Sequence, residues 1–137
     1  IDEDSLNANI LRHLLEFPLI PVIAPITYER FGNLLNTNAD TIASQVAVGM
    51  SNLYDTSIYY CFELNGVLND INDKDSVIKH INSVSYADLL KEGIIAEGML
   101  PKLENCFDAL KNGVETINMG NTSMLTKEND NFTRITL

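Results

Sequence analysis

The sequence predicts an α/β fold in which helices cover both faces of a mainly parallel sheet, a three-layer αβα sandwich. Amphipathic stretches of helical period alternate along the chain with short apolar runs, as α/β folds require. These runs are apolar almost throughout, which is typical of parallel strands buried on both faces. The 137 residues suit one domain, and 45% of them are hydrophobic, enough for a core.

The first part of the chain is expected to form a helix, a strand and a hairpin. A helix over 5–16 has Ser5 as its predicted N-cap and one apolar stripe. Pro18 should end this helix, because proline cannot continue it. Residues 19–26 are almost wholly apolar and are expected to form a buried strand. A Phe-Gly-Asn sequence within 27–35 predicts a hairpin there.

The middle of the chain is expected to add a helix and a second buried strand. A helix over 39–50 has Asx residues available as caps, and Ile42, Val46 and Met50 would face inward. Residues 55–64 are rich in Ile, Tyr, Cys and Phe, which favours a strand. An Asn-Gly turn signal follows this strand.

The last part of the chain is expected to alternate helices with strands. The expected elements are an extended piece or helical turn at 77–81, helices at 86–92 and 100–112, and strands at 114–119 and 132–137. Gly93 and Gly113 directly follow the two helices, and glycine is the usual residue after a helix end.

Composition narrows the kinds of partner. The net charge of −10 argues against nucleic acid or an anionic membrane as the main partner, because phosphates need clustered Lys and Arg. The longest apolar run, 17–26, is far too short to span a bilayer. Cys61 and Cys106 lack zinc or CxxC spacing and are expected as buried residues in a reducing cytosol.

Residues 36–40, Asn-Thr-Asn-Ala-Asp, are expected where a strand passes into a helix. Asx residues favour such corners for local reasons, and helix capping alone explains one of them. Three around one corner exceed what a single cap needs. A carboxylate in the first helical turn can also orient a neighbouring ammonium group, so this corner is a candidate site.

Lys102 is expected in the first turn of its helix, just after Pro101. A lysine there is unfavourable for the helix dipole, which prefers anions at that end. A bound phosphate would turn this cost into a gain, and the alternative is a solvated lysine on a helix face. Together with the acidic corner, Lys102 suggests phosphoryl transfer.

No metal site is predicted. Residues 69–75 resemble a calcium loop, but counted from Asp70 they lack Gly at position 6 and have Ile81 at position 12. The segment is expected to be a solvated turn. The sequence also lacks a P-loop and a Gly-rich dinucleotide fingerprint.

The order of several stretches resembles the acetylglutamate kinases of the amino acid kinase family. The matching stretches are Ile-Pro-Val-Ile-Ala-Pro-Ile at 20–26, Asn-Thr-Asn-Ala-Asp-Thr at 36–41, Leu-Asn-Gly-Val-Leu at 64–68, Gly-Ile-Ile at 93–95, Gly-Met-Leu-Pro-Lys at 98–102, Ala-Leu at 109–110 and Gly-Val at 113–114. The Asn-x-Asn-Ala-Asp stretch is the most specific of these.

The resemblance implies an amino acid kinase-like fold and ATP-dependent phosphorylation of the side-chain carboxylate of N-acetyl-L-glutamate, or of another N-acyl-L-glutamate such as N-succinyl-L-glutamate. This reaction belongs to arginine biosynthesis in the cytoplasm. The cofactors would be ATP and Mg²⁺ held through the nucleotide, and the complete enzyme would be a homo-oligomer, expected as a dimer.

The resemblance also implies site residues. Asn36 and Asn38 would bind the substrate, Asp40 would position the catalytic lysines, and Lys102 would stabilise the transferring phosphoryl group. The expected ATP-binding residues are Glu63, Leu64, Asn65, Gly66, Val67, Leu68, Ile94, Ile95, Ala96, Gly98 and Met99.

The resemblance covers the C-terminal, nucleotide-binding half of that family. Its Gly-rich phosphate loop, second catalytic lysine and substrate-binding arginine belong to an N-terminal half that is not among residues 1–137, so this single domain is expected to be inactive alone. Phe62-Glu63 replaces the family's Ser-Asp or Thr-Asp. The alternatives are a non-catalytic nucleotide-binding module and a different amino acid kinase.

Overall fold

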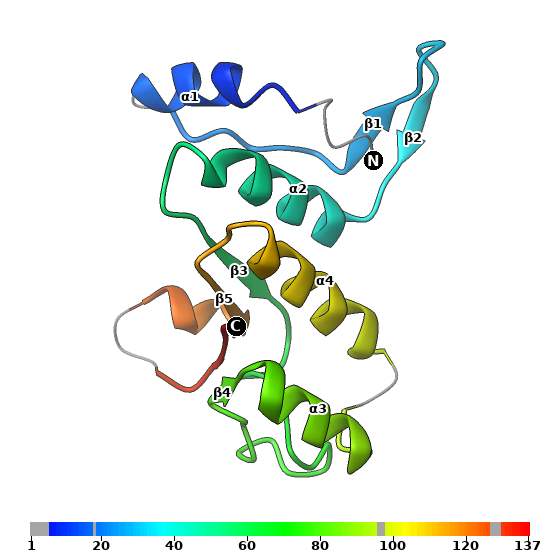
Figure 1. Ribbon diagram of the computed structural model, residues 1–137, viewed down its shortest axis with the longest axis vertical. Coiled ribbons are helices and arrows are strands. Elements are labelled where there is room, and N and C mark those ends of the chain that lie inside the picture. The colour runs from blue at the N-terminus through cyan, green and yellow to red at the C-terminus, as the bar shows by residue number, and fades with distance from the viewer. Residues whose placement is uncertain (1–5, 18, 96–97, 127–129) are drawn as a thin grey trace.

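The computed structural model describes residues 6–17, 19–95, 98–126 and 130–137 (Figure 1). Its elements, in chain order, are α1 (Ala8–Glu16), β1 (Ile26–Tyr28), β2 (Leu34–Asn36), α2 (Ala39–Ser51), β3 (Ser57–Cys61), β4 (His80–Ile81), α3 (Ser83–Lys91), α4 (Leu100–Lys111), β5 (Thr116–Gly120), the 3-10 helix η2 (Thr122–Leu125) and β6 (Thr133–Ile135). No helix within these described ranges is long and apolar enough to cross a membrane.

The main sheet has the strand order β3-β5-β6-β4. β3 runs parallel to β5, and β4 runs parallel to β6, whereas β5 and β6 are antiparallel. Parallel neighbours need long crossover connections, and α3 and α4 lie in the stretch of chain that joins β3 to β5. The α/β class with a mainly parallel sheet, predicted from the sequence, is therefore confirmed.

One face of this sheet carries the core. Ile58 and Tyr60 of β3 lie opposite Ile117 and Met119 of β5 in the parallel register, so these four side chains share a face. Helix residues that bury against them come mainly from α4: Leu103, Cys106, Phe107, Ala109 and Leu110. The expected burial of Cys106 is confirmed.

The other face of the sheet is more polar. Tyr59 on β3 is 49% exposed, and Cys61 is also exposed, so the expected burial of Cys61 is wrong. The physical reason is alternation along the strand: Ile58 and Tyr60 take the core side, which leaves Tyr59 and Cys61 on the opposite side.

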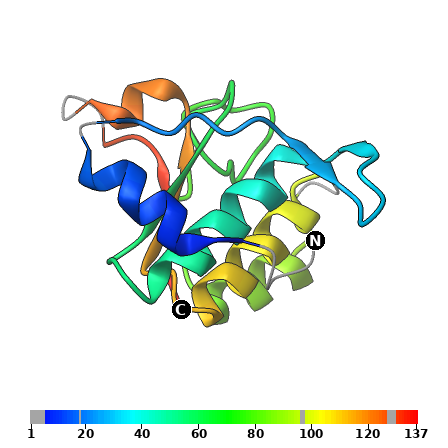
Figure 2. The ribbon, with the colours of Figure 1, turned by 90° about the horizontal axis from the view of Figure 1, so that it is seen from above.

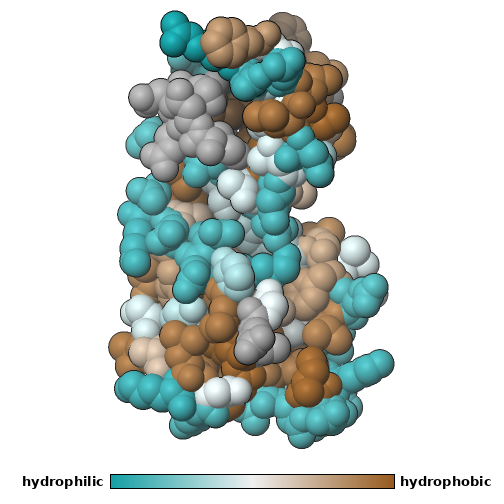
Figure 3. Space-filling view, turned by 90° about the vertical axis from the view of Figure 1, so that its right-hand side faces the viewer, coloured by the Kyte–Doolittle hydropathy of each residue, from teal (hydrophilic) through white to brown (hydrophobic). Residues whose placement is uncertain are grey.

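The N-terminal elements lie at one end of the molecule. Figures 1 and 2 show α1 and the β1–β2 hairpin beside α2, with α4 on the side of α2 away from them. β1 and β2 pair antiparallel, which confirms the predicted hairpin. Its large apolar side chains are exposed, among them Tyr28 and Phe31. Figure 3 shows hydrophobic side chains at this end, separated by a hydrophilic band from a second hydrophobic area below.

The prediction of a buried strand over 19–26 is wrong. Only Ile26 belongs to a strand, and Ile20 and Val22 are 90% and 93% exposed. Pro21 and Pro25 supply no N–H to a strand ladder, and within the described chain β1 and β2 pair only with each other. Apolar composition alone cannot provide the pairing partner that a buried strand needs.

Two helices begin at residues other than those predicted. α1 begins at Ala8 because Asn7 accepts a hydrogen bond from the N–H of Ile10, while the proposed cap Ser5 and the stop Pro18 lie outside the described residues. α3 begins three residues earlier than predicted. Its start is a capping box between Asn82 and Ser85.

The other predicted elements are present, although β3 and β6 are clearly shorter than the predicted strands. The helices at 39–50 and 100–112 correspond to α2 and α4, and the strands at 55–64, 114–119 and 132–137 to β3, β5 and β6. Of the three residues expected to face inward from α2, Met50 is buried. Ile42 and Val46 are half-buried, and all three residues line an apolar groove of about 570 Å³ beside Pro21.

The end of β5 approaches the turn after β3 so closely that only glycine fits. A Cβ atom at Gly120 would lie 2.5 Å from the carbonyl oxygen of Asn65. Because this neighbour is backbone, it cannot rotate away. Glycine therefore permits the contact between the two strand ends that the parallel pair brings together.

We expect Gly120→Ala to lower the free energy of unfolding by about 1–3 kcal/mol through overpacking. Gly98→Ala is the matched control, since a Cβ atom there meets nothing within 4 Å. Urea unfolding of both variants measures the difference. Equal stability of the two variants would show that the strand ends can separate at no cost.

Candidate active site

The start of α2 is fixed by a side-chain cap. Asn38 Oδ1 accepts hydrogen bonds from the N–H groups of Asp40 at 2.8 Å and Thr41 at 3.4 Å. The cap satisfies two donors that have no partner within the helix. It also places Asp40 in the first turn, where the helix dipole stabilises a carboxylate.

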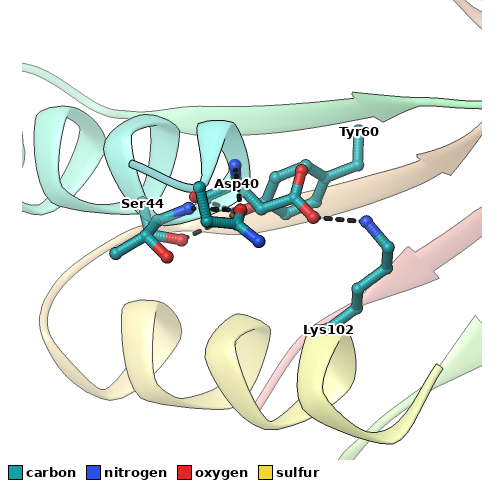
Figure 4. Close-up of polar contacts among 6 residues, drawn as sticks. Asp40, Ser44, Tyr60 and Lys102 are labelled. Atoms are coloured by element: carbon teal, nitrogen blue, oxygen red, sulfur yellow. Dashed lines mark hydrogen bonds and ion pairs between the residues drawn. The ribbon is translucent and has the colours of Figure 1, made fainter. Parts of the chain in front are cut away.

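Asp40 forms an ion pair with Lys102, which lies 62 residues away in sequence and on a different helix (Figure 4). Lys102 lies in the first turn of α4, and Pro101 stands beside it in that turn. A cation is unfavourable at this end of a helix, and the carboxylate of Asp40 offsets the cost. The side chains of Lys102 and Asp40 are 43% and 26% exposed, so the pair remains open to solvent.

This corner can hold an anion. An ammonium group has three N–H donors, and Asp40 occupies one of the three on Lys102. The N-cap of α4, Met99, makes no side-chain capping bond, which leaves first-turn N–H groups for another acceptor. A phosphate group is the ligand that such a combination of a cation and helix N–H groups binds best.

Two further side chains, not anticipated from the sequence, form hydrogen bonds at this corner on the side that faces the sheet. The hydroxyl group of Tyr60 lies 2.7 Å from Ser44 Oγ and donates to the backbone carbonyl of Asp40 at 3.2 Å. Tyr60 projects from β3 and Ser44 from α2, and both are buried. One sequence signal existed: a tyrosine in a buried strand needs a partner for its hydroxyl group.

Burial raises the pKa values of two groups near the ion pair. Burial raises the pKa of Tyr60 to about 12, although the hydrogen bond with Ser44 partly opposes this. Burial also raises the pKa of Cys106 to about 12, with the negative charge of Asp40 adding to the effect and Lys102 opposing it. Both groups are therefore neutral at ordinary pH.

The predicted nucleotide loop follows β3. Glu63 is exposed, whereas Gly66, Val67 and Leu68 are buried. The N–H of Val67 donates to Thr133 Oγ1 at 2.8 Å, which anchors the loop to β6. The side-chain amide of Asn65 accepts from that of Asn121, just after β5, so the loop is tied to two neighbouring strand ends.

The remaining predicted residues are spread over neighbouring elements. Asn36 ends β2 with an exposed side chain. Ile95 is buried in the core, Met99 packs against that core, and Gly98 is exposed. Leu64 and Ile94 are half-buried, and Ala96 lies outside the described residues. The structure thus joins Asn38, Asp40 and Lys102 in one corner; the roles of all these residues stay predictions.

Comparison with known proteins gives the family. Residues 2–121 match the amino acid kinase family. The chain belongs to this family. Its relatives include the acetylglutamate kinases of Cytophaga hutchinsonii, at 46% identity over 116 residues, and of Bacteroides thetaiotaomicron, at 45% over 116 residues. The match covers 85% of this chain but only 44% and 45% of those enzymes, so this amino acid kinase chain spans less than half their length.

Solved structures agree on the fold of this amino acid kinase chain. An N-acetylglutamate synthase from Neisseria gonorrhoeae, complexed with coenzyme A and N-acetylglutamate, superposes with a TM-score of 0.79 at 19% identity, over 96% of this chain and 31% of that one. Carbamate kinase from Giardia lamblia, bound to AMP-PNP, gives 0.63 at 13% identity, over 96% and 49%. At these identities the likeness shows the fold alone.

The raised pKa values predict a loss of stability at alkaline pH. The folded state keeps Tyr60 and Cys106 neutral to about pH 12, whereas the unfolded chain ionises them near their ordinary pKa values of 10.0 and 9.0. Their contribution to stability is therefore complete below pH 9 and declines as pH rises toward 12. Urea unfolding from pH 8 to 12 should show this decline. Tyr60→Phe should reduce its slope above pH 10 by about 1.4 kcal/mol per pH unit, the effect of one proton.

Tyr59→Phe is the control for this measurement, because Tyr59 lies half-exposed on the other face of the sheet. It should keep the slope of the unsubstituted chain. A slope above pH 10 that Tyr60→Phe leaves unchanged would mean that the buried phenol does not contribute to it.

Proposed function

We propose that this chain supplies the nucleotide-binding half of an acetylglutamate kinase, which transfers the terminal phosphoryl group of ATP to the side-chain carboxylate of N-acetyl-L-glutamate in arginine biosynthesis. The observation that carries the proposal is the Asp40–Lys102 ion pair at the starts of two helices. The acetylglutamate kinases among its relatives support the substrate. The partial coverage of those relatives supports the assignment to half of an enzyme.

Catalysis of phosphoryl transfer depends mainly on positioning the two substrates and on placing positive charge near the oxygens of the transferred group. In this proposal, Lys102 directs its two remaining N–H donors at the phosphoryl oxygens, and its positive charge stabilises the negative charge that develops there. Asp40 holds the ammonium group in place from the opposite side. ATP supplies the phosphoryl group and the leaving group.

The nucleotide would bind at the ends of the parallel strands. Residues 63–68 after β3 form a loop anchored by Thr133 and Asn121, and the uncapped first turn of α4 would bind a phosphate of the nucleotide. The described residues contain no group of three or more His, Cys, Asp or Glu side chains that would hold a metal ion. We propose that Mg²⁺ is held largely through the phosphates, as is usual for this cation.

Further parts of the proposal concern the complete enzyme. Asn36 and Asn38 stand beside Asp40 in sequence and would hold the acylated substrate. An assay with N-acetyl-L-glutamate and N-succinyl-L-glutamate separates the two acyl groups. We also propose a cytoplasmic homo-oligomer, a dimer, in which this domain provides the ATP site.

Nucleotide binding is the first expectation to test on this chain alone. MgADP at 100 times its Kd should add about 2.7 kcal/mol of stability, since it binds the folded state only. This corresponds to a rise of several degrees in Tm, measured by calorimetry. A chain that melts cooperatively at the same Tm with and without MgADP would contradict a self-contained nucleotide site.

Loss of Lys102 should impair turnover. In the full-length enzyme, Lys102→Ala should reduce kcat at least tenfold, or about 1.4 kcal/mol of transition-state stabilisation. Lys111→Ala is the matched control, because Lys111 ends the same helix and its ion-pair partner among the described residues is the exposed Asp108. If Lys102→Ala retained more than a tenth of the control's kcat, Lys102 would not be the phosphoryl-stabilising residue.

A further inference from the structure

We infer that Tyr60 and Ser44 form a buried hydroxyl pair that positions Asp40, and through it Lys102, for phosphoryl transfer. The inference rests on the proposed function, and it adds two positioning residues to the site. Neither residue is in the Asn-x-Asn-Ala-Asp or Gly-Met-x-Pro-Lys stretch. Figure 4 shows Tyr60 extending toward Asp40 from the strand, and Lys102 reaching toward Asp40 from the other helix.

Asp40 is held on both sides of its backbone. Its N–H group donates to Asn38 Oδ1 at 2.8 Å, and its carbonyl oxygen accepts from the Tyr60 hydroxyl group at 3.2 Å. The first bond is a local helix cap, while the second comes from a strand of the sheet. Residues in a first helical turn often fray, and the bond from β3 ties this turn to the core instead.

The hydroxyl pair has a defined direction. Tyr60 has one hydroxyl hydrogen and donates it to the carbonyl of Asp40, so in the 2.7 Å contact Ser44 must be the donor. Ser44 lies one helical turn after Asp40, which puts both on the side of α2 that faces β3. Ser44 and Tyr60 are only 7% and 9% exposed, so the bond between their hydroxyl groups is shielded from water.

The ion pair needs such support because it is partly exposed. Ion pairs that are open to solvent contribute too little stability to fix the geometry of two side chains on separate helices. A displacement of 1 Å in a catalytic group can cost on the order of 100-fold in rate. A part-buried hydrogen bond from the sheet holds the backbone of Asp40, and the short aspartate side chain then transmits that position to Lys102.

β3 also links this support to the nucleotide. Tyr60 stands three residues before Glu63, where the proposed nucleotide loop begins. The same strand therefore sets the position of Asp40 through a side chain and the position of the loop through its backbone. The hydroxyl pair aligns the substrate corner with the nucleotide loop, which the transfer reaction requires.

The test uses steady-state kinetics of the full-length enzyme with Tyr60→Phe, which keeps the ring and removes only the hydroxyl group. We expect kcat to fall roughly five- to thirty-fold, by misplacement of Asp40, with KM for both substrates within about twofold. Ser44→Ala should lower kcat in the same direction but less. The matched control is Tyr59→Phe, the adjacent residue on the other face of β3, which should leave kcat unchanged.

A double-mutant cycle shows whether the hydroxyl pair acts through Asp40. In an Asp40→Asn background, Tyr60→Phe should cause no further loss of kcat, because the group that it positions is already gone. An equal loss in both backgrounds would overturn the inference, as would a Tyr60→Phe variant that matches Tyr59→Phe. If Asp40→Asn itself kept full kcat, the proposed role of Asp40 would fail, and that result is distinct from either of these.

A readout without turnover keeps the inference testable in this chain. The ammonium ¹H–¹⁵N signal of Lys102 is visible only while the ion pair slows proton exchange with water. It should weaken in Tyr60→Phe and in Ser44→Ala, and stay unchanged in Tyr59→Phe. An ammonium signal equally strong in all of these variants, with the fold retained, would overturn the inference.

Discussion

The parallel pairing of β3 with β5 is the constraint on which the rest of this domain depends. Its register puts Ile58 and Tyr60 beside Ile117 and Met119, and α4 buries its apolar stripe against that face. The same pairing brings the ends of both strands together. Position 120 must be glycine there, because a Cβ atom would collide with the backbone of the loop after β3. One strand pair therefore positions both the core residues and the loop of the candidate site.

The site follows from helices that begin at one end of this core. The first turns of α2 and α4 carry opposite charges, Asp40 and Lys102, which form an ion pair with each other. Asp40 suits its helix dipole and Lys102 opposes it, so the lysine keeps an unfavourable position that a phosphate would improve. A locally unfavourable residue supported by its surroundings is typical of a functional site.

Local signals predicted well those elements that depend on local chemistry. An Asx cap before α2, the glycine after α4 and the apolar stripe of that helix were readable from sequence, because capping and helical periodicity act over a few residues. Residues 19–26 were misjudged for the opposite reason. Apolar composition indicates a strand, but a strand also needs a neighbour, and no local signal supplies one.

The sequence by itself determined the family pattern, the Asx-rich corner and the lysine at a helix start. Only the tertiary structure decided that Asp40 meets Lys102 across 62 residues, and that Tyr60 and Ser44 support Asp40 from the sheet. Contacts between residues so far apart depend on how helices pack on a sheet, and no spacing along the chain encodes that packing. Composition predicted Tyr60 as a strand residue, and only the packing of α2 on the sheet placed its hydroxyl group against Asp40.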